Sequence, residues 1–597
     1  LFRTVVKMGV RKHRYAEAIE LSKQAIKIDP QDWYSLAQLG TNYLRLGDDA
    51  NGLKYLKQAW SGDRFNVRNY NLLNLFEEDV AKSYTFVRSK HFRVRAHRDE
   101  AKLLERVVVP ELERAFRTYE RKYGFTPRLP VTVELFRDPQ HYAVRTVGLP
   151  GLHALGVCFG RVITSTSPLA GRFNWGQVLW HELNHVFTIQ MSRSRIPRWF
   201  TEGLADMEPL LRRPEWRREH DFDIYRAIRA GRLKGLASMR TAFSRARNIQ
   251  DMVVAYYQGS LMAMYLVKHW GLARTLTAVR AYAKGKRTAQ ILPAITGISL
   301  SELDQRFKAA QLKRLSHYRG NWYVDPRSYS DLDGWRARAR ARPADSSTQT
   351  GLALALMFHR KLKQARQAAR AVLKAQPRNR EALYVLAKSS IAMRDVRQGE
   401  SYLRKLLAAG GDGYEVREAL GRLAIRRKDL AAAARHLNRA KQLDPERGAP
   451  YAALAVAYKH AGKIDQQIAE LKGLVRIDQQ SYRPLAALNR LLAGRKDYVA
   501  LRRFGKMAYY ISPGTARVHL HLADALAAPA PRPQLARAIW HLHTALMCDP
   551  KQPAEIHVKL ARLYLQRRDR RRARKHLDEA LKLDPRNRAA RALKSKI

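Results

Sequence analysis

The sequence is poor in cysteine, in acidic side chains and in long apolar runs, and each shortage excludes a class of protein. Its 597 residues include only two cysteines, Cys158 and Cys548, which supply no disulfide framework. No run of 18 apolar residues occurs, so the sequence predicts no transmembrane helix. Zinc knuckles, RNP sequences and phosphate-binding glycine loops are also missing, which argues against the common nucleic-acid-binding modules.

Acidic residues are outnumbered by basic ones throughout the chain. There are 111 Lys and Arg against 53 Asp and Glu, a formal net charge of +58 that no single tail carries. One interpretation is contact with a polyanion, such as nucleic acid, anionic lipid or an acidic polymer, through the basic surface. The other, which is simpler, is a general basic bias on solvated helix faces. Aromatic residues near basic ones, such as Tyr509 and Tyr510, form no recognisable nucleic-acid motif.

The most informative motif is Trp180-His181-Glu182-Leu183-Asn184-His185. Positions i and i+4 of a helix share one face, so His181 and His185 can bind a single metal ion. Glu182 lies one step round the helix, beside the metal, where it can take a proton from a bound water. The flanking residues are apolar, which predicts a buried helix, and buried histidines and glutamates are costly without partners. A metal ion would supply that partner.

A second segment completes the set of metal ligands. Pro197 ends any earlier helix, and residues 199–207 read as a new helix that carries Glu202. A His-His-Glu set leaves the fourth position of a zinc ion open for water. Asp206 follows Glu202 by one turn and is either the hydrogen-bond partner of a ligand histidine or an ordinary solvated carboxylate. Gly203 allows another backbone to approach closely.

The flanks carry a repeat. Helix-boundary residues recur every 34 residues, and Asp-Pro pairs end several of the units, including one near the start of the chain, at Asp29-Pro30. The boundary residues are Pro343, Pro377, Gly411, Pro445, Gln479 and Pro513, followed at longer intervals by Pro550 and Pro585. The flanks therefore resemble tetratricopeptide repeats, which are helix-turn-helix units of this period. Such solenoids either dock a protein partner or substrate in a concave groove or act as scaffolds.

The segment from about Ser89 to Leu315 resembles the gluzincin metallopeptidases, and in particular the bacterial peptidase MA-like domain related to the aminopeptidase N and thermolysin families. The resemblance includes strands near 131–136 and 157–164, the two helices described above, and Tyr256-Tyr257-Gln258-Gly259 opening a further helix. It implies that zinc is held by His181, His185 and Glu202, that Glu182 is the general base, and that Asp206 supports a ligand histidine.

The resemblance also implies an oxyanion donor. Tyr256 matches the tyrosine of the family's Tyr-x-x-Gly motif, whose hydroxyl stabilises the tetrahedral intermediate. Tyr257 is the alternative donor, and a tyrosine that only packs in the core is the third possibility.

The strand before the zinc helix departs from the aminopeptidase pattern. Aminopeptidases of this clan carry an acidic residue there, which pairs with the free amino terminus of the substrate. No carboxylate occurs in residues 155–161. Gly156, Val157, Cys158, Phe159 and Gly160 are therefore predicted to be an edge strand that pairs with an extended substrate, and this favours internal cleavage. Arg161 alone is a weak indication of acidic substrate residues.

The sequence thus predicts a mostly α-helical protein in which a zincin-like α+β metallopeptidase domain separates two tetratricopeptide solenoids. The expected parts are repeats over 1–85, the peptidase domain over 89–318, a linker or divergent capping helix over 319–342, and a solenoid over 343–597. The expected function is zinc-dependent peptide-bond hydrolysis, more as an endopeptidase than as an aminopeptidase. The alternative is a catalytically inactive scaffold for assembly.

The compartment is a separate expectation. The chain begins with Leu1, inside the first helix of a predicted repeat, so the N-terminus is expected to be truncated. An exported, periplasmic or membrane-associated bacterial protein fits this expectation.

Overall fold

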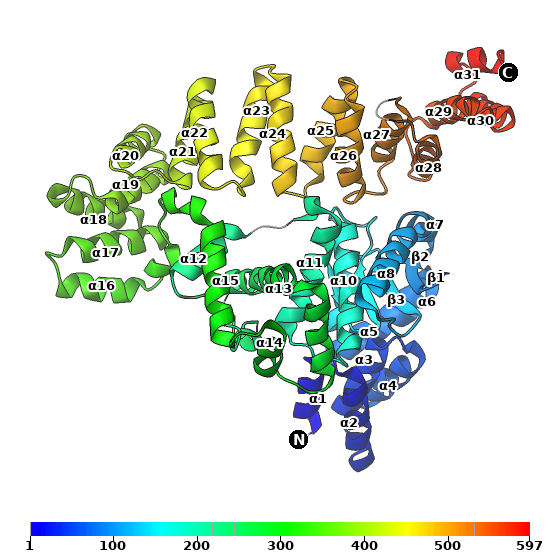
Figure 1. Cartoon of the computed structure of the whole chain (residues 1–597), viewed down its shortest axis with the longest axis horizontal. Coiled ribbons are helices and arrows are strands. Elements are labelled where there is room, and N and C mark those ends of the chain that lie inside the picture. The colour runs from blue at the N-terminus through cyan, green and yellow to red at the C-terminus, as the bar shows by residue number, and fades with distance from the viewer. Residues whose placement is uncertain (1, 218–219, 244, 247, 530–531) are drawn as a thin grey trace. The chain divides into compact units, whose positions relative to one another are not determined.

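The computed structural model describes residues 2–217, 220–243, 245–246, 248–529 and 532–597 (Figure 1). Helices make up 71% of it, so the prediction of a mostly helical protein is confirmed. Contacts divide the chain into two compact units. The first contains Leu1–Arg218, Arg232–Lys308 and Asp478–Ile597, and the second contains Glu219–Gly231 and Ala309–Ile477.

The first unit opens with two helical hairpins. Their helices are α1 (Phe2–Val10), α2 (Tyr15–Ile28), α3 (Trp33–Arg45) and α4 (Asp49–Gly62). Asp32 and Asp48 accept hydrogen bonds from backbone N–H groups at the starts of α3 and α4, which fixes where these helices begin. The turn inside each hairpin is left-handed, at His13 (φ 55°) and at Gly47 (φ 83°). Helix α5 (Val67–Asn74) then leads through a π-helical segment and α6 (Ala81–Ser83) into a sheet.

A five-stranded mixed sheet forms the centre of the peptidase-like part. Its strands are β1 (Tyr84–Arg88), β2 (Phe92–His97), β3 (Val131–Phe136), β4 (Gly156–Cys158) and β5 (Val162–Thr166), in the order β1-β2-β3-β5-β4. Pairs β2–β3 and β3–β5 are parallel, and β1–β2 and β4–β5 are antiparallel. All six residues of β3 are buried because it lies in the middle. Helices α7 (Arg98–Val107), α8 (Val109–Tyr123) and α9 (Pro139–Val147) complete this part.

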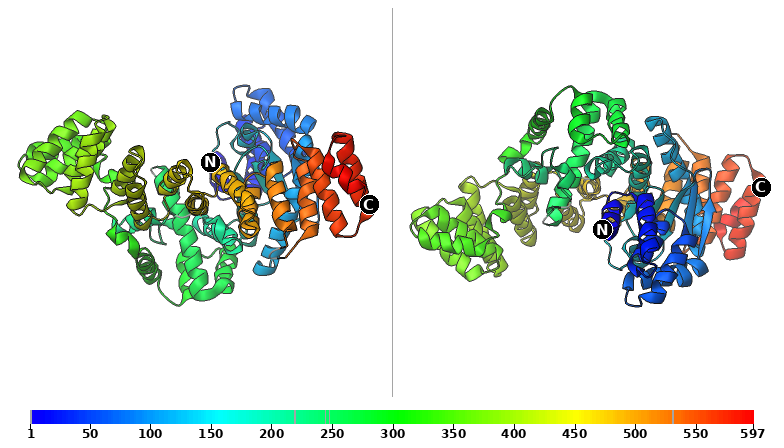
Figure 2. Two further views of the ribbon diagram at one scale, coloured as in Figure 1. Left: turned by 90° about the horizontal axis from the view of Figure 1, so that it is seen from above. Right: turned by 90° about the horizontal axis from the view of Figure 1, so that it is seen from below.

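The N-terminal hairpins pack beside this sheet (Figure 2). Arg95 of β2 forms ion pairs with Glu134 of β3 and with Asp49 of α4. Arg145 of α9 donates a hydrogen bond of 2.7 Å to the carbonyl of Leu44. These buried arginines fix the turns of the repeats against the sheet, since a buried guanidinium is stable only when its donors are paired.

The sheet differs from the sequence prediction in two ways. The single strand expected near 157–164 is a hairpin, because Gly160 adopts φ 85° and Phe159 N–H bonds to the Val162 carbonyl at 2.7 Å. Phe159 and Gly160 therefore lie in the turn, and only Gly156–Cys158 form the edge strand. Strands β1 and β2 were not predicted, although Phe92, Val94 and Ala96 alternate toward the core as strand residues do.

Three helices build the candidate site: α10 (Trp175–Met191), α11 (Arg198–Arg212) and α13 (Ile249–Ala283). The prediction that Tyr256 to Gly259 opens a helix was wrong: Asn248 caps α13, so the motif lies inside it. Gly203 and Gly259 stand where α11 and α13 cross, and a Cβ at Gly259 would lie 2.7 Å from the Trp199 carbonyl oxygen. The two glycines let the helices approach closely, as expected for Gly203. Helices α14 (Thr288–Thr296) and α15 (Leu300–Arg314) follow.

The last helices of the first unit contact the start of α10 and fix it through hydrogen bonds. The Trp175 backbone N–H donates to the Tyr510 carbonyl at 3.0 Å, and the Trp175 indole N–H donates to the Tyr509 carbonyl at 3.1 Å. Tyr510 also packs on Trp216 and accepts a hydrogen bond from Arg213. Tyr509 and Tyr510 are thus packing residues. These helices are α25 (Tyr482–Gly494), α26 (Tyr498–Tyr509), α27 (Ala516–Ala527), α28 (Leu535–Leu546), α29 (Pro553–Gln566), α30 (Arg570–Leu583) and α31 (Arg588–Lys594).

The second unit consists of α12 (Asp221–Arg229) and a row of helical hairpins. The stretch 319–342 includes a helix, α16, rather than only an extended linker. Arg360, Arg394, Lys428 and Gly462, which are 34 residues apart, occupy left-handed turns between paired helices, as in a regular solenoid. The helices are α16 (Leu332–Ala341), α17 (Ser346–Phe358), α18 (Leu362–Ala375), α19 (Arg380–Ala392), α20 (Val396–Ala408), α21 (Tyr414–Arg426), α22 (Leu430–Leu443), α23 (Gly448–His460) and α24 (Ile464–Ile477).

Within the described ranges, no helix has both the length and the apolar character that crossing a bilayer requires.

A buried histidine pair makes the last repeats of the first unit sensitive to acid. His519 on α27 donates through Nε2 to the Pro513 carbonyl at 2.7 Å, so its Nδ1 accepts from His541 Nδ1 at 3.0 Å. Burial lowers the pKa of His519 to about 4 and that of His541 to about 2. Both rings are therefore neutral in the folded protein at pH 5, whereas in the unfolded chain they take up protons below about pH 6.5.

The two buried neutral rings should therefore contribute to the free energy of unfolding of these repeats. We expect this contribution to be present above about pH 6.5 and to be lost as the pH falls toward 4, because the unfolded chain binds more protons there. His519 alone should account for about 2 kcal/mol between pH 7.5 and 5. Amide exchange of α27 and α28, corrected for intrinsic rates, measures the change. A His519→Gln/His541→Gln variant should show a flatter pH dependence, and an equally steep one would contradict this assignment.

Candidate metal centre

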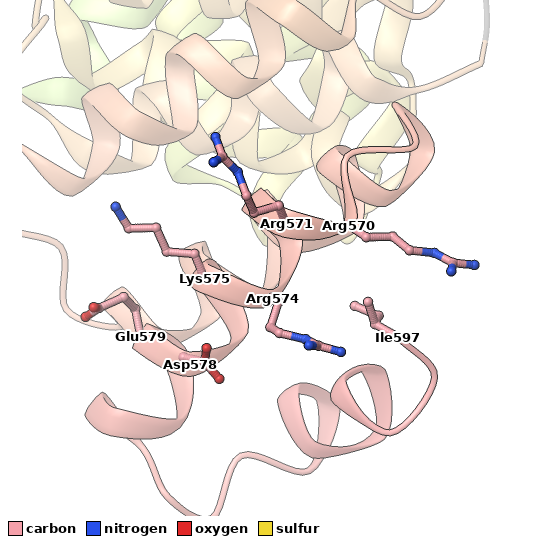
Figure 3. A pocket seen from close by; sticks show the side chains of 7 residues that line it. All are labelled: Arg570, Arg571, Arg574, Lys575, Asp578, Glu579 and Ile597. Carbon is pink, nitrogen blue, oxygen red and sulfur yellow. The ribbon is translucent and has the colours of Figure 1, made fainter.

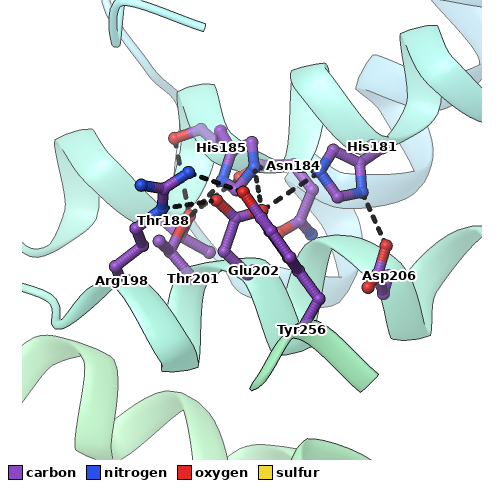
Figure 4. Close-up of polar contacts among 9 residues, drawn as sticks. All are labelled: His181, Asn184, His185, Thr188, Arg198, Thr201, Glu202, Asp206 and Tyr256. Atoms are coloured by element: carbon purple, nitrogen blue, oxygen red, sulfur yellow. Dashed lines mark hydrogen bonds and ion pairs between the residues drawn. The ribbon is translucent and has the colours of Figure 1, made fainter. Parts of the chain in front are cut away.

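Two histidines of α10 and one glutamate of α11 converge on a single point. His181 Nε2 and His185 Nε2 lie 3.1 Å apart, and Glu202 Oε2 lies 3.4 Å from the first and 3.3 Å from the second (Figure 4). Their ligand atoms all lie within 4.8 Å of one another, and the described residues contain no other such group of three. The structure thus brings together the three predicted zinc ligands.

Hydrogen bonds behind His185 fix which ring nitrogen carries its proton. Thr188 Oγ1 donates to the Asn184 carbonyl at 3.1 Å, so its hydrogen is used there. Thr201 Oγ1, 2.8 Å from Thr188 Oγ1, must then donate to it. Thr201 can therefore only accept from His185 Nδ1, at 2.8 Å. The proton of a neutral His185 lies on Nδ1, and its Nε2 presents a lone pair to the centre.

Asp206 has the same effect on His181. Its Oδ1 accepts from His181 Nδ1 at 3.0 Å, the contact predicted from its position one turn after Glu202. Burial lowers the pKa of His181, but Asp206 and Glu202 outweigh it and raise that pKa well above the usual range. A neutral His181 also points its Nε2 lone pair inward.

The donor set fits a zinc ion. When both rings are neutral, two imidazole lone pairs and a carboxylate oxygen face one another at hydrogen-bond distance, so the group is stable only with a proton on His181 or a metal ion among the three. Three carboxylates, those of Glu182, Glu202 and Asp206, surround the two histidines and favour a cation further. Two histidines and one glutamate are also a ligand set that catalytic zinc sites use.

Glu182 lies beside this centre under the edge strand. Its side chain is buried, and burial raises its pKa. A Cβ at Gly156 of β4 would lie 2.8 Å from Glu182 Cγ and 3.0 Å from Oε1. In the structure the absence of a side chain at Gly156 makes room for Glu182, and close approach of a substrate backbone at this glycine stays a prediction. Because the strand covers the carboxylate, the site is shielded from bulk water on this side.

Tyr256 points from α13 toward Glu202, as Figure 4 shows. Its hydroxyl accepts a hydrogen bond of 2.5 Å from Arg198 Nη2, while Arg198 Nε donates to Glu202 Oε1 at 3.2 Å. Burial raises the pKa of Tyr256 to about 12, so the phenol keeps its proton at neutral pH. Since Arg198 donates to the phenol oxygen, the O–H hydrogen remains available to a substrate. Tyr257 is about 100° further round the helix and is buried.

Two residues of this site were not predicted from the sequence. Arg198 links Glu202 to Tyr256, and Thr201 orients His185. A signal for Arg198 was present in its spacing: it precedes Glu202 by four residues and lies directly before the predicted helix 199–207, so it shares the face of Glu202 once the helix begins at Arg198. The role of Thr201 depends on a contact with the neighbouring helix, which spacing along the chain does not reveal.

The predicted edge-strand residues lie near this centre. Val157 is half-buried on β4, and Cys158 is buried, which raises the pKa of its thiol well above the ordinary value. Phe159 packs against Tyr15 of the N-terminal hairpin, with ring centroids 5.9 Å apart. Beyond its pairing with β5, no hydrogen bond of β4 to another strand occurs in the described part of the chain.

Basic side chains also line a pocket of about 600 Å³ on the last repeat. The lining residues are Arg570, Arg571, Arg574, Lys575, Asp578, Glu579 and Ile597. Figure 3 shows that the four cations point in different directions and that two carboxylates, Asp578 and Glu579, lie next to them. The cations of this pocket do not converge on one position where an anion could bind, so polyanion contact stays a prediction.

Comparison with known families agrees with the presence of a peptidase-like part and of helical repeats. Residues 113–313 match the Peptidase MA superfamily, and residues 350–392, 384–448 and 554–587 match tetratricopeptide repeats. The chain therefore carries a Peptidase MA superfamily domain together with tetratricopeptide repeats, and such repeats indicate protein–protein interaction. The superfamily is typically associated with zinc. No curated protein matches the chain in sequence.

Solved structures similar to this chain include repeat proteins. YrrB, described as a TPR protein with an unusual peptide-binding site, is 13% identical over 44% of this chain and 99% of its own, with a TM-score of 0.24. MamA from Desulfovibrio magneticus RS-1 is 16% identical over 29% of this chain and 97% of its own, with a TM-score of 0.23. PilF of Pseudomonas aeruginosa is 16% identical over 42% and 97%, with a TM-score of 0.23.

Proposed function

We propose that this protein is a zinc-dependent peptidase of the gluzincin type that cleaves within peptide chains. The observation that carries the proposal is the pair of hydrogen bonds that turn His181 Nε2 and His185 Nε2 toward Glu202. Surface histidines that happen to have this spacing would not have both outer nitrogens held by partners. The Peptidase MA superfamily domain at residues 113–313 supports the same function.

The residues of the chain divide the chemistry among them. A zinc ion held by His181, His185 and Glu202 would act as a Lewis acid that polarises the scissile carbonyl and acidifies a water molecule. Glu182 accepts the proton of the attacking water at its carboxylate and passes it to the leaving amine. Its raised pKa makes it a stronger base than an exposed glutamate. Tyr256 donates its O–H to the oxygen that becomes negative.

The absence of a carboxylate on the edge strand supports internal cleavage. Residues 155–161, which include β4 and the turn after it, contain no acidic side chain to hold a substrate's free amino group. Among the carboxylates at the centre, Glu202 and Asp206 are paired with the ligand histidines, and Glu182 is the base. An extended peptide can instead add to the free edge of β4 through main-chain hydrogen bonds.

The test is cleavage of a diverse peptide library by the zinc-loaded protein, read by mass spectrometry beside Glu182→Gln. Internal cuts made only by the native protein would support the proposal. Removal of single N-terminal residues would show that the argument from the edge strand is wrong. No cleavage by a protein that holds one zinc per chain would favour the alternative, a scaffold without turnover.

Tyr256→Phe should lower kcat by about 10²-fold to 10³-fold, because one oxyanion donor is lost. Zinc content should stay unchanged, since Tyr256 reaches the ligands only through Arg198. Steady-state kinetics and metal analysis measure both. Tyr257→Phe is the matched control, and a larger loss in that variant would move the donor role to Tyr257.

A further inference from the structure

The turn of the first N-terminal hairpin lies beside the strand that covers Glu182, because Tyr15 packs on Phe159 at the end of β4 and Gly156 of β4 contacts Glu182. Burial lowers the pKa of His13 to about 4, and the charges of His185, Glu202 and Arg198 also act on it. His13 lies outside the group of three that can hold a metal, so it is a neighbour of the centre and not a ligand. A repeat far from the peptidase helices in sequence thus places a polar side chain beside them.

Aromatic packing holds this turn in place. Tyr15 and Phe159 are both buried and meet edge to face, and the Arg45 guanidinium lies 5.5 Å from the Tyr15 ring centroid and 5.9 Å from that of Phe159. Val10, Leu46 and Val157 surround this contact. Edge-to-face rings and a stacked guanidinium each add to the energy of burial, so the turn is fixed against the end of β4.

Tyr15 also fixes the tautomer of His13. The Tyr15 hydroxyl lies 3.1 Å from His13 Nδ1, and its pKa is raised by burial, so it keeps its proton. A buried O–H needs an acceptor, and Nδ1 is the one that the described part of the chain offers it. The proton of the neutral His13 ring therefore lies on Nε2. That N–H donates to no group in the described residues.

The turn geometry itself does not call for histidine. The same left-handed position of other hairpins is taken by Gly47, Arg360, Arg394, Lys428, Gly462, Lys496 and Arg568. The arginines and lysines among them are exposed, whereas His13 is half-buried. A left-handed turn is easy for glycine and tolerated by a side chain that extends into water. A half-buried imidazole with a free donor points to a ligand instead.

We propose that this turn forms one wall of the substrate cleft and that His13 Nε2–H donates a hydrogen bond to a main-chain carbonyl of the bound peptide. The inference rests on the proposed function. A peptide paired with β4 (Gly156–Cys158) begins beside Glu182, which contacts Gly156, and continues toward the turn at Phe159, which packs on Tyr15. Three residues of extended chain span about 10 Å, so His13 meets the peptide a few residues from the reacting bond. Because His13 would bond to the main chain, it should bind peptides of any sequence that are long enough to reach it.

The experiment measures binding of fluorescein-labelled random-sequence peptide pools, twelve and six residues long, to the full zinc-loaded chain carrying Glu182→Gln. His13→Asn keeps a residue that suits the left-handed turn, but its amide does not reach the position of Nε2. His13→Gln suits the turn less well, but places an N–H near that position. A purely structural role would therefore favour Asn, whereas a donor role favours Gln.

We expect His13→Asn to weaken binding of the longer pool about fivefold to tenfold, as loss of one hydrogen bond does. His13→Gln should return binding to within about twofold of the Glu182→Gln parent, and the shorter pool should bind all variants more nearly alike. Lys428→Asn, the same change at a matched turn, should bind like the parent. Unchanged binding by His13→Asn, or weaker binding by His13→Gln than by His13→Asn, would overturn the inference.

Two outcomes separate the inference from the proposed function. If the native chain cleaves peptides, and His13→Asn leaves both peptide binding in the Glu182→Gln parent and cleavage in the otherwise native chain unchanged, the proposed function is kept and the role given to His13 is wrong. If peptides bind in a His13-dependent way but are never cleaved, the proposed contact of His13 with the peptide is supported and the proposed peptidase activity is wrong. If neither pool binds the parent at all, the proposed cleft is wrong and the inference is wrong with it.

Discussion

Glu182→Gln is expected to lower kcat by about 10²-fold to 10⁴-fold while one zinc per chain is retained. Glutamine has the size of glutamate and cannot accept the proton of the attacking water, so the general base is lost with little change in shape. The tight contact with Gly156 matters here, because a larger residue at position 182 would displace β4. Turnover of a peptide from the library, zinc content by mass spectrometry and peptide affinity together measure the effect.

The matched control is Glu105→Gln, at an exposed glutamate of α7. It should have the activity and zinc content of the native chain. Glu182→Gln should also bind peptides as tightly as the native chain, because the change acts on a proton transfer and not on docking. If Glu182→Gln keeps turnover within about tenfold of the native value, the base is another residue.

The repeat architecture could be predicted because it depends on residues that lie close together in the sequence. The 34-residue spacing of Pro and Gly marks, and of left-handed turns such as Arg394 and Lys428, belongs to each hairpin separately. The start of α13 was misplaced because it was taken from the resemblance to the family's Tyr-x-x-Gly motif, whereas the local capping residue is Asn248.

The sheet was harder to predict because it depends on contacts between distant residues. Of the predicted strands, only the one near 131–136, which was taken from the family resemblance, has the ends of a strand in the structure, β3. β2 contains Arg93 and Arg95, and arginines normally indicate exposure. Arg95 is buried through ion pairs with Glu134 and Asp49, partners that no local pattern identifies.

The site divides in the same way. Helical spacing was enough to bring His181 and His185 together, and a second helix with Glu202 was enough to suggest the third ligand. Asp206 could be placed because it lies one turn from Glu202. Thr201 acts on His185 from a different helix, so its role follows from a tertiary contact that spacing along the chain does not reveal.

Loss of zinc in His185→Ala is the second large effect that we expect. His185 is one of three ligands, and two ligands do not retain the ion at concentrations at which the native chain is saturated. Peptide cleavage should fall with the metal. Zinc content after dialysis against a weak chelator measures the loss, and His460→Ala, at an exposed histidine of α23, should keep the native content.

Thr201→Val gives a graded version of the same prediction. Valine has nearly the shape of threonine but cannot accept the His185 Nδ1 proton, so the ring is no longer held in the tautomer that presents Nε2. Zinc affinity should fall by about tenfold to a hundredfold, which is the usual effect of removing such a supporting hydrogen bond. Competition with a chromophoric chelator measures it.

Native affinity in Thr201→Val, with zinc lost in His185→Ala, would mean that packing alone orients the ring. One zinc per chain in His185→Ala would mean that His185 is not a ligand.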